Sequence, residues 1–154
     1  LTPGGPVPGE RGQVHHRRVY PVGRLDYESE GLLLATNDGE LALRLAHPRY
    51  EVEKRYRVWL DRDLDSVDMQ RLIAGLFLEG VHLRLAGIAP APHPHRDGPV
   101  YDIRLREGRN RQIRRMMEAV GRRVLRLVRT ELGPLRLGHL TLGAARPLTA
   151  NEIA

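Results

Sequence analysis

The sequence predicts an α+β domain in which a mixed, mainly antiparallel sheet has helices packed on one face. Segments with the alternating apolar pattern of strands interleave with segments of helical periodicity along the 154 residues. Several connections between them are too short for the crossovers that parallel strands need, so most neighbouring strands are expected to be antiparallel. A chain of this length buries roughly 70% of the surface that its unfolded form exposes, which is enough for one self-contained core.

The domain is expected over residues 19–154, behind an irregular lead-in at residues 1–18 that is rich in Gly, Pro, His and Arg. The apolar run from Gly31 to Thr36 predicts a buried strand. Asn37 or Asp38 in the following turn can cap a short helix over residues 40–45, which ends before Pro48.

A strand and a helix are expected next. The alternating pattern from Glu51 to Leu60 predicts a strand whose Tyr56 face points inward, because that face carries most of the apolar side chains. Asp65 or Ser66 can cap a helix that continues to about residue 78. The buried side of this helix is expected to contain Val67, Leu72, Ile73 and Leu76.

The second half of the chain is expected to alternate between strands and one helix. Four prolines and two histidines predict a loop over residues 87–99. The remaining expected elements are strands over 81–85 and 101–105, a helix over 111–120 that Gly121 ends, and strands over 124–130 and 140–143.

The charge of the chain points to an anionic partner. The formal net charge is +6, Lys54 is the only lysine, and nine arginines against two acids lie between Arg104 and Arg126. Clustered arginines suit phosphate contacts and stacking on bases, so a nucleic acid is the expected partner. The alternative is a solvated arginine-rich face.

The composition also excludes several classes of protein. The absence of cysteine excludes disulfides, thiol catalysis and Cys-ligated zinc, and it fits a cytoplasmic protein. No apolar run approaches the roughly 18 residues of a membrane span. Because the chain begins with Leu1 rather than Met, it is expected to be a fragment.

The first segment that can carry chemistry runs from Gly23 to Gly31. Asp26 lies two residues after Arg24, in a turn-like stretch directly before the first apolar strand. A neighbouring guanidinium favours the ionised carboxylate, which can then act as a nucleophile or stabilise charge. The alternative is a turn aspartate that bonds only to the local backbone.

Two further segments have a nucleic-acid character. Tyr56, if its strand lies at a sheet edge, could stack on an extruded base or accept a proton, although a tyrosine on an apolar face is also common in cores. The segment from Glu107 to Met116 joins a turn to a helix start, where backbone N–H groups and arginines favour phosphate. Arg111 and Arg115 share one side of that helix and Arg114 is offset; a solvated basic helix is the alternative.

No metal site is expected. His15 and His16, and likewise His93 and His95, lack a third ligand nearby in the sequence. The segment from Asn37 to Glu40 does not have the ligand spacing of a calcium loop, and no glycine-rich phosphate-binding motif is present.

Taken together and in this order, the segments resemble the pseudouridine synthases, and most closely the RsuA-type ribosomal branch. The similar segments are Val22-Gly23-Arg24-Leu25-Asp26, Glu30-Gly31-Leu32-Leu33-Leu34, Glu53-Lys54-Arg55-Tyr56, Glu107 to Met116, and the ending from Leu135 to Glu152. The resemblance covers about residue 19 to the end. Arg109-Asn110-Arg111-Gln112 is more similar to the synthases that act on the large ribosomal subunit, such as the B type.

The resemblance implies the pseudouridine synthase catalytic-domain fold and a role for each matched residue. Asp26 matches the catalytic aspartate, and Tyr56 matches the tyrosine that stacks on the flipped uracil and is a candidate for removing its carbon-5 proton. Arg114 matches the basic residue that pairs with the aspartate, and Arg24 the arginine associated with base flipping and phosphate contact. Arg109, Arg111 and Arg115 are expected to bind RNA, and no cofactor is implied.

The expected function is therefore the isomerisation of a uridine in ribosomal RNA, by a monomer that acts on the RNA or on a ribosome-assembly particle. An N-terminal RNA-binding domain and a first catalytic-domain strand, usual in this branch, are not recognisable. One alternative is a non-catalytic RNA-binding or ribosome-assembly module on the same fold. Another is a glycan hydrolase that uses Asp26 and Glu30, which would need a neutral polar cleft.

Overall fold

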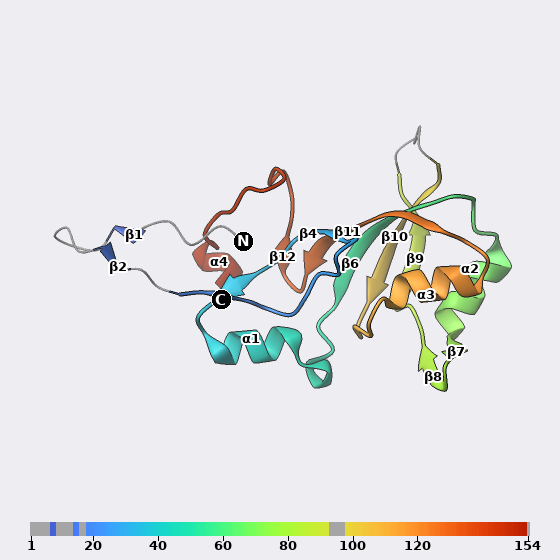
Figure 1. Cartoon of the computed structure of the whole chain (residues 1–154), viewed down its shortest axis with the longest axis horizontal. Coiled ribbons are helices and arrows are strands. Elements are labelled where there is room, and N and C mark those ends of the chain that lie inside the picture. Colours follow the sequence, from blue (N-terminus) through green and yellow to red (C-terminus); the bar gives the residue numbers. More distant parts are fainter. Residues whose placement is uncertain (1–6, 9–13, 16–17, 93–97, 154) are drawn as a thin grey trace.

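The computed structural model describes residues 7–8, 14–15, 18–92 and 98–153, and its centre is a six-stranded sheet (Figure 1). Five strands pair in the order β12-β11-β6-β10-β9, and β4 pairs with the free part of β11. The strands are β4 (Glu30–Gly31), β6 (Lys54–Leu60), β9 (Gly87–Pro90), β10 (Val100–Leu105), β11 (Val124–Leu132) and β12 (Leu135–Arg136). All pairings are antiparallel except that of β4 with β11, which confirms the predicted mixed, mainly antiparallel sheet.

Three helices carry the side chains that matter for packing. α1 (Gly39–Ala46) begins at Asp38, whose carboxylate accepts hydrogen bonds from the backbone N–H groups of Glu40 and Leu41. α2 (Ser66–Ala74) begins at Asp65 in the same way, and α3 (Gln112–Ala119) ends before Gly121, which adopts a positive φ of 75°. These caps and stops agree with the sequence prediction. The short 3-10 helix η2 (Pro48–Tyr50) follows α1, and α4 (Ala150–Ile153) lies near the end of the chain.

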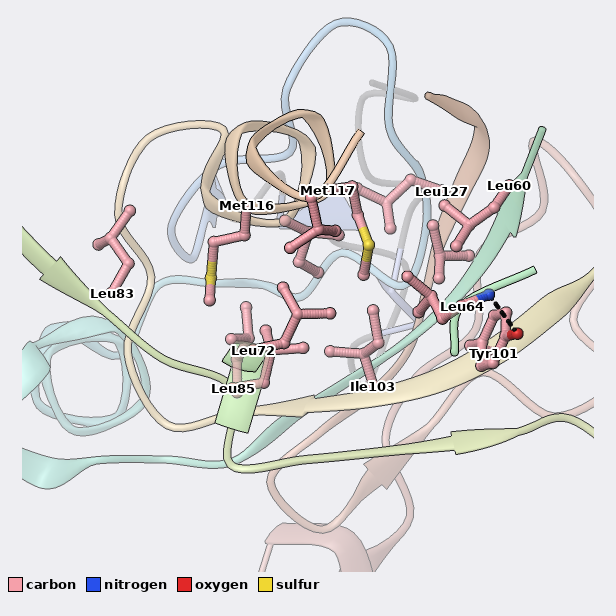
Figure 2. Close-up of a cluster of buried hydrophobic side chains, with 14 residues drawn as sticks. Leu60, Leu64, Leu72, Leu83, Leu85, Tyr101, Ile103, Met116, Met117 and Leu127 are labelled. Carbon is pink, nitrogen blue, oxygen red and sulfur yellow. Dashed lines mark hydrogen bonds between the residues drawn. The ribbon is translucent and has the colours of Figure 1, made fainter. Parts of the chain in front are cut away.

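The main core lies between the sheet and two helices, α2 and α3 (Figure 2). Met116 and Met117 from α3 and Leu72 from α2 pack on Val58 of β6 and Ile103 of β10, and all five are fully buried. Tyr101 is also buried, and its hydroxyl accepts a hydrogen bond from the N–H of Leu64 at 2.9 Å. One face of the sheet is therefore covered by helices, as predicted.

A second, smaller cluster lies at the β12 end of the sheet. Its buried members are Val22, Leu34, Leu132 and Leu135, and Leu45 from α1 packs against them. Val22 directly follows β3 (Tyr20–Pro21) and Leu34 directly precedes β5 (Ala35–Thr36), which pairs with β3. The sheet is thus flanked by two apolar groups of different size, and β11 contributes to both.

The predicted single strand from Gly31 to Thr36 is wrong. The segment divides into β4, which pairs with β11, and β5, which pairs with β3, with no strand at Leu32–Leu34. Gly31 has a φ of +108°, a conformation that turns the chain out of one sheet toward the other.

Four further predictions are corrected. α2 ends at Ala74, and the expected last turn is instead the hairpin of β7 (Leu76–Leu78) with β8 (Val81–Leu83), because Gly75 adopts a φ of +107° that a helix cannot continue. Of the residues expected on its buried side, Leu72 is buried but Val67 and Ile73 are exposed. Residues 87–90, expected in a loop, form the edge strand β9, and the predicted strand at 140–143 is absent from this described stretch.

Parts of the lead-in are also described. β1 (Val7–Pro8) and β2 (Val14–His15) pair antiparallel, and the remainder of residues 1–17 lies outside the described residues. The side chains of the four histidines considered for metal binding also lie outside them. No helix in the described ranges has the length and apolar character needed to cross a membrane.

Candidate active site

The turn that carries Asp26 is held by its backbone at both ends. The N–H of Val22 donates to the carbonyl of Leu34 at 2.7 Å, and the N–H of Leu32 donates to the carbonyl of Arg129 at 2.8 Å. Within the turn, the N–H of Ser29 donates to the carbonyl of Asp26 at 2.9 Å. Because these bonds use only main-chain atoms, the Asp26 carboxylate is left available, and its side chain is partly exposed.

Asp26 lines a cleft of about 430 Å³ that lies between the two apolar clusters. Tyr56 and Arg114 line the same cleft, so the structure brings together three residues that lie far apart in the sequence. Of the residues predicted to bind RNA, Arg24, Arg109 and Arg111 also line it, whereas Arg115 does not. Arg115 lies outside the cleft and pairs with Glu79 of the β7–β8 turn at 3.6 Å.

The charges in the cleft are unequal. Asp26 is the only carboxylate among the described residues that line it, against six basic side chains. These are Arg24, Lys54, Arg109, Arg111, Arg114 and Arg129. A cleft of this kind attracts a polyanion and surrounds one carboxylate with positive charge.

Arg114 and Arg111 are held by Glu28, two residues beyond Asp26. The Arg114 side chain is 11% exposed and donates to the backbone carbonyl of Glu28 at 2.8 Å, and its Nη1 lies 3.7 Å from the Glu28 carboxylate. Arg111 donates to the same carboxylate at 3.0 Å. The hydrogen bond and charge of Arg111, followed by the charge of Arg114, hold the pKa of Glu28 below its usual value. Among the described residues Arg114 pairs with Glu28 and makes no ion pair with Asp26, and its pairing with the aspartate stays a prediction.

The loop before α3 is held from inside by Gln112. Gln112 is buried, donates to the carboxylate of Glu107 at 2.6 Å, and accepts a hydrogen bond from the N–H of Arg109 at 3.2 Å. Arg111 occupies the left-handed region with a φ of 52° and gives α3 no side-chain cap. The first backbone N–H groups of α3 are thus free of a capping side chain at the edge of the cleft.

Tyr56 lies on a central strand, not on an edge strand as considered above. β6 pairs with β10 on one side and with β11 on the other, and Tyr56 lies opposite Ile103 and Arg129 in these registers. Its side chain is half-buried and reaches the cleft from the helix-covered face of the sheet. The ring is therefore fixed by its neighbours and exposed toward the cleft.

Residues 10–119 of this chain match the RNA pseudouridylate synthase family. The chain belongs to this family. It is 40% identical over 143 residues to the ribosomal large subunit pseudouridine synthase B of Bacillus subtilis, which covers 89% of this chain and 57% of that protein. It is 42% identical over 144 residues to the ribosomal large subunit pseudouridine synthase E of Xanthomonas campestris, covering 84% and 76% respectively.

The fold comparison agrees. A crystal structure of a pseudouridylate synthase matches with a TM-score of 0.76 and 31% identity, over 88% of this chain and 58% of the other. The chain spans somewhat more than half of the length of the first curated relatives, 57% and 55%. The resemblance to the ribosomal pseudouridine synthases that the three motifs indicated is confirmed.

In this pseudouridylate synthase family member, sequence reasoning missed four residues of the site. Lys54 and Arg129 line the cleft, Glu28 holds two arginines, and Gln112 supports the loop. Lys54 could have been found from its position two residues before Tyr56 on the same strand face. Arg129 had no such signal, because it lies in an apolar-patterned strand whose register only the folded sheet reveals.

The glycan-hydrolase alternative needs a second carboxylate, and the described residues that line the cleft of this family member include none besides Asp26. Glu30, the partner expected for Asp26, accepts two hydrogen bonds from Arg126, at 3.0 and 2.9 Å. These hydrogen bonds and the charge of Arg126 lower the pKa of Glu30. Glu30 is therefore committed to an ion pair outside the residues that line the cleft.

Proposed function

We propose that this protein isomerises a uridine of ribosomal RNA, in the large subunit, to pseudouridine, with Asp26 as the catalytic carboxylate. The observation that carries the proposal is the composition of the cleft: one carboxylate, a half-buried tyrosine and six basic side chains line a single space. Further support comes from the names of the relatives, several of which are ribosomal large subunit pseudouridine synthases.

The chemistry fits these groups. The bond between uracil N1 and ribose carbon 1 breaks, the base turns, and carbon 5 bonds to the ribose carbon, after which carbon 5 loses its proton and N1 gains one. Asp26 can attack the ribose carbon, attack the ring, or assist departure of the base, and all three need an ionised carboxylate. Tyr56 is proposed to stack on the flipped uracil and to remove the carbon-5 proton, and Arg114 to hold the Asp26 turn through Glu28.

The arginines in and beside the cleft are proposed to bind the phosphates of the RNA. Extruding a uridine costs a few kcal/mol, which contacts to the flanking phosphates and stacking on the base offset. Arg24, Arg109 and Arg111 line the cleft, and Arg115 extends the basic surface beyond it. We therefore propose phosphate contacts for these four residues.

The isomerisation is redox-neutral, and the proposal includes no cofactor and no metal. The partner is ribosomal RNA or a ribosome-assembly particle, and we propose that the protein acts as a monomer in the cytoplasm.

Tritium release from ribosomal RNA labelled at uridine carbon 5 tests the proposal. We expect release with the protein and none with its Asp26→Asn variant, while RNA affinity in a filter-binding assay stays within about twofold, because the amide has the same shape and only the charge is lost. Unchanged turnover by the variant would overturn the assignment of Asp26. Binding without release by either protein, on naked RNA and on ribosomal particles, would favour a non-catalytic RNA-binding module.

A further inference from the structure

Two cations meet on the sheet floor of the cleft. Arg129 of β11 is only 4% exposed, and its Nε donates to the carbonyl of Leu32 at 2.8 Å, while its Nη2 is buried and has no hydrogen-bond partner. Lys54 is half-buried on β6, and a Cβ added at Gly108 would lie 3.4 Å from its Nζ. Both side chains line the same cleft as Asp26.

Neither cation has a carboxylate partner within the described part of the chain. No ion pair of the described residues includes Lys54 or Arg129, although fifteen pairs occupy most of the other charged positions. Burial and then the charge of Arg129 lower the pKa of Lys54. Two like charges that are withdrawn from water without a counterion raise the free energy of the folded protein. A negative charge placed between them would offset that free-energy cost.

The position of the pair indicates which anionic group it can reach. Arg129 lies directly opposite Tyr56 in the register of β11 with β6, and Lys54 is two residues from Tyr56 on the same face. Opposite side chains in a sheet are about 5 Å apart at Cβ, and residues i and i+2 on one strand about 7 Å. A base that stacks on Tyr56 therefore has its edge within reach of both cations, whereas the phosphate contacts proposed above lie at Arg24 and at the arginines of the loop before α3.

We propose that Lys54 and Arg129 form an electropositive subsite at the edge of the flipped uracil, which stabilises the negative charge that develops there when its bond to ribose breaks. This inference rests on the proposed isomerase function. When the N1–carbon 1 bond breaks, its electron pair stays with the base and spreads over N1 and the two carbonyl oxygens. The charge disappears when carbon 5 bonds to the ribose carbon, so the two cations act on the transient anion and not on the substrate or the product.

Lys54→Met tests the subsite, since methionine keeps an unbranched apolar stem and removes only the charge. We expect the single-turnover rate of pseudouridine formation in ribosomal RNA to fall about 100-fold, the typical cost of removing one preorganised charge-stabilising donor. The dissociation constant of the RNA and its dependence on salt are expected to stay within about twofold of wild type. The matched control is Arg55→Met, which removes one cation from the adjacent position of the same strand, where the side chain faces away and pairs with Glu131.

The outcomes separate the subsite from other roles. A wild-type rate in Lys54→Met would overturn the subsite alone. Weaker RNA binding with a flatter salt dependence and an unchanged rate would also overturn it, because Lys54 would then be a phosphate contact. An equal loss of rate in Arg55→Met would also overturn the subsite, because the rate would then depend on the net charge of the protein and not on the position of Lys54. No product from the wild-type protein would overturn the proposed function, and the subsite with it.

Discussion

Main-chain hydrogen bonds on either side of Asp26 hold its turn in place. Three arginines that line the same cleft make their hydrogen bonds to groups other than the Asp26 carboxylate. Arg111 and Arg114 are committed to Glu28, and Arg129 to the carbonyl of Leu32. The cleft thus contains a carboxylate without an ion-pair partner among the described residues, close to arginines whose directions are already set. Preorganisation of this kind lowers the cost of rearranging charges during a reaction.

Tyr56→Phe separates stacking from proton transfer at the residue scale. The phenyl ring keeps the stacking surface and loses the hydroxyl, so we expect RNA affinity to stay within about twofold and the single-turnover rate to fall at least about 100-fold, the lower end of the range for general-base catalysis. Tyr56→Ala is expected also to weaken RNA binding by about 1 kcal/mol or more. A wild-type rate in Tyr56→Phe would exclude the hydroxyl from proton transfer. The readout is quenched-flow detection of pseudouridine.

At the scale of elements, the pairing of β4 with β11 anchors the C-terminal end of the turn that carries Asp26. Gly31 has a φ of +108°, and a Cβ added there would lie 2.2 Å from the carbonyl oxygen of Arg129. The backbone of β4 therefore approaches β11 more closely than any side chain would allow. This contact joins the turn that carries Asp26 to the strand that carries Arg129.

Gly31→Ala tests this junction. We expect the free energy of unfolding to fall by more than about 2 kcal/mol, because backbone strain and a steric clash with β11 add together. Gly23→Ala is the matched control: Gly23 also has a positive φ, of 69°, but an added Cβ meets nothing within 4 Å. The free energy of unfolding of Gly23→Ala is expected to fall by only about 1 kcal/mol, from backbone strain alone. Urea denaturation followed by circular dichroism measures both, and equal losses would contradict the clash.

At the scale of the whole molecule, the cleft lies where the two apolar clusters meet, and both contribute to its walls. Leu132 from the smaller cluster and Ile113 from the larger one line it. The groups proposed to be catalytic on the Asp26 turn and on α3 therefore lie beside differently packed ends of one sheet. The basic side chains around the cleft give this region its attraction for a polyanion.

The salt dependence of RNA binding tests which arginines belong to that region. In a plot of log association constant against log salt, Arg111→Ala is expected to reduce the slope by about one unit, and the Arg111→Ala, Arg115→Ala double variant by about two. Arg44→Ala is the matched control, since Arg44 lies outside the cleft, on α1, and pairs with Glu40. A slope for the double variant equal to that of Arg111→Ala would place Arg115, which pairs with Glu79, away from the RNA.

Local interactions made much of this protein predictable. The helix starts at Asp38 and Asp65, the stop at Gly121 and the inward face of β6 depend on residues within a few positions of one another, so their patterns appear in the sequence. The three motifs also indicated the family, and the comparisons confirm it. The predictions failed where one local pattern suits two structures. The apolar run Leu76–Leu78 could continue the preceding helix or form a strand, and the positive φ of Gly75 ends the helix just before it.

The sequence by itself determined the α+β class, most of the helix boundaries, and the three segments whose side chains line the cleft. Only the tertiary structure decided which charges meet: Glu28 with Arg111 and Arg114, Glu30 with Arg126, and Lys54 with Arg129. The physical reason is that such partners depend on strand register and on the close approach of β4 to β11. The alternation along a strand indicates the face on which each side chain lies. Which residue of a distant segment lies opposite it is decided only when the two segments pair.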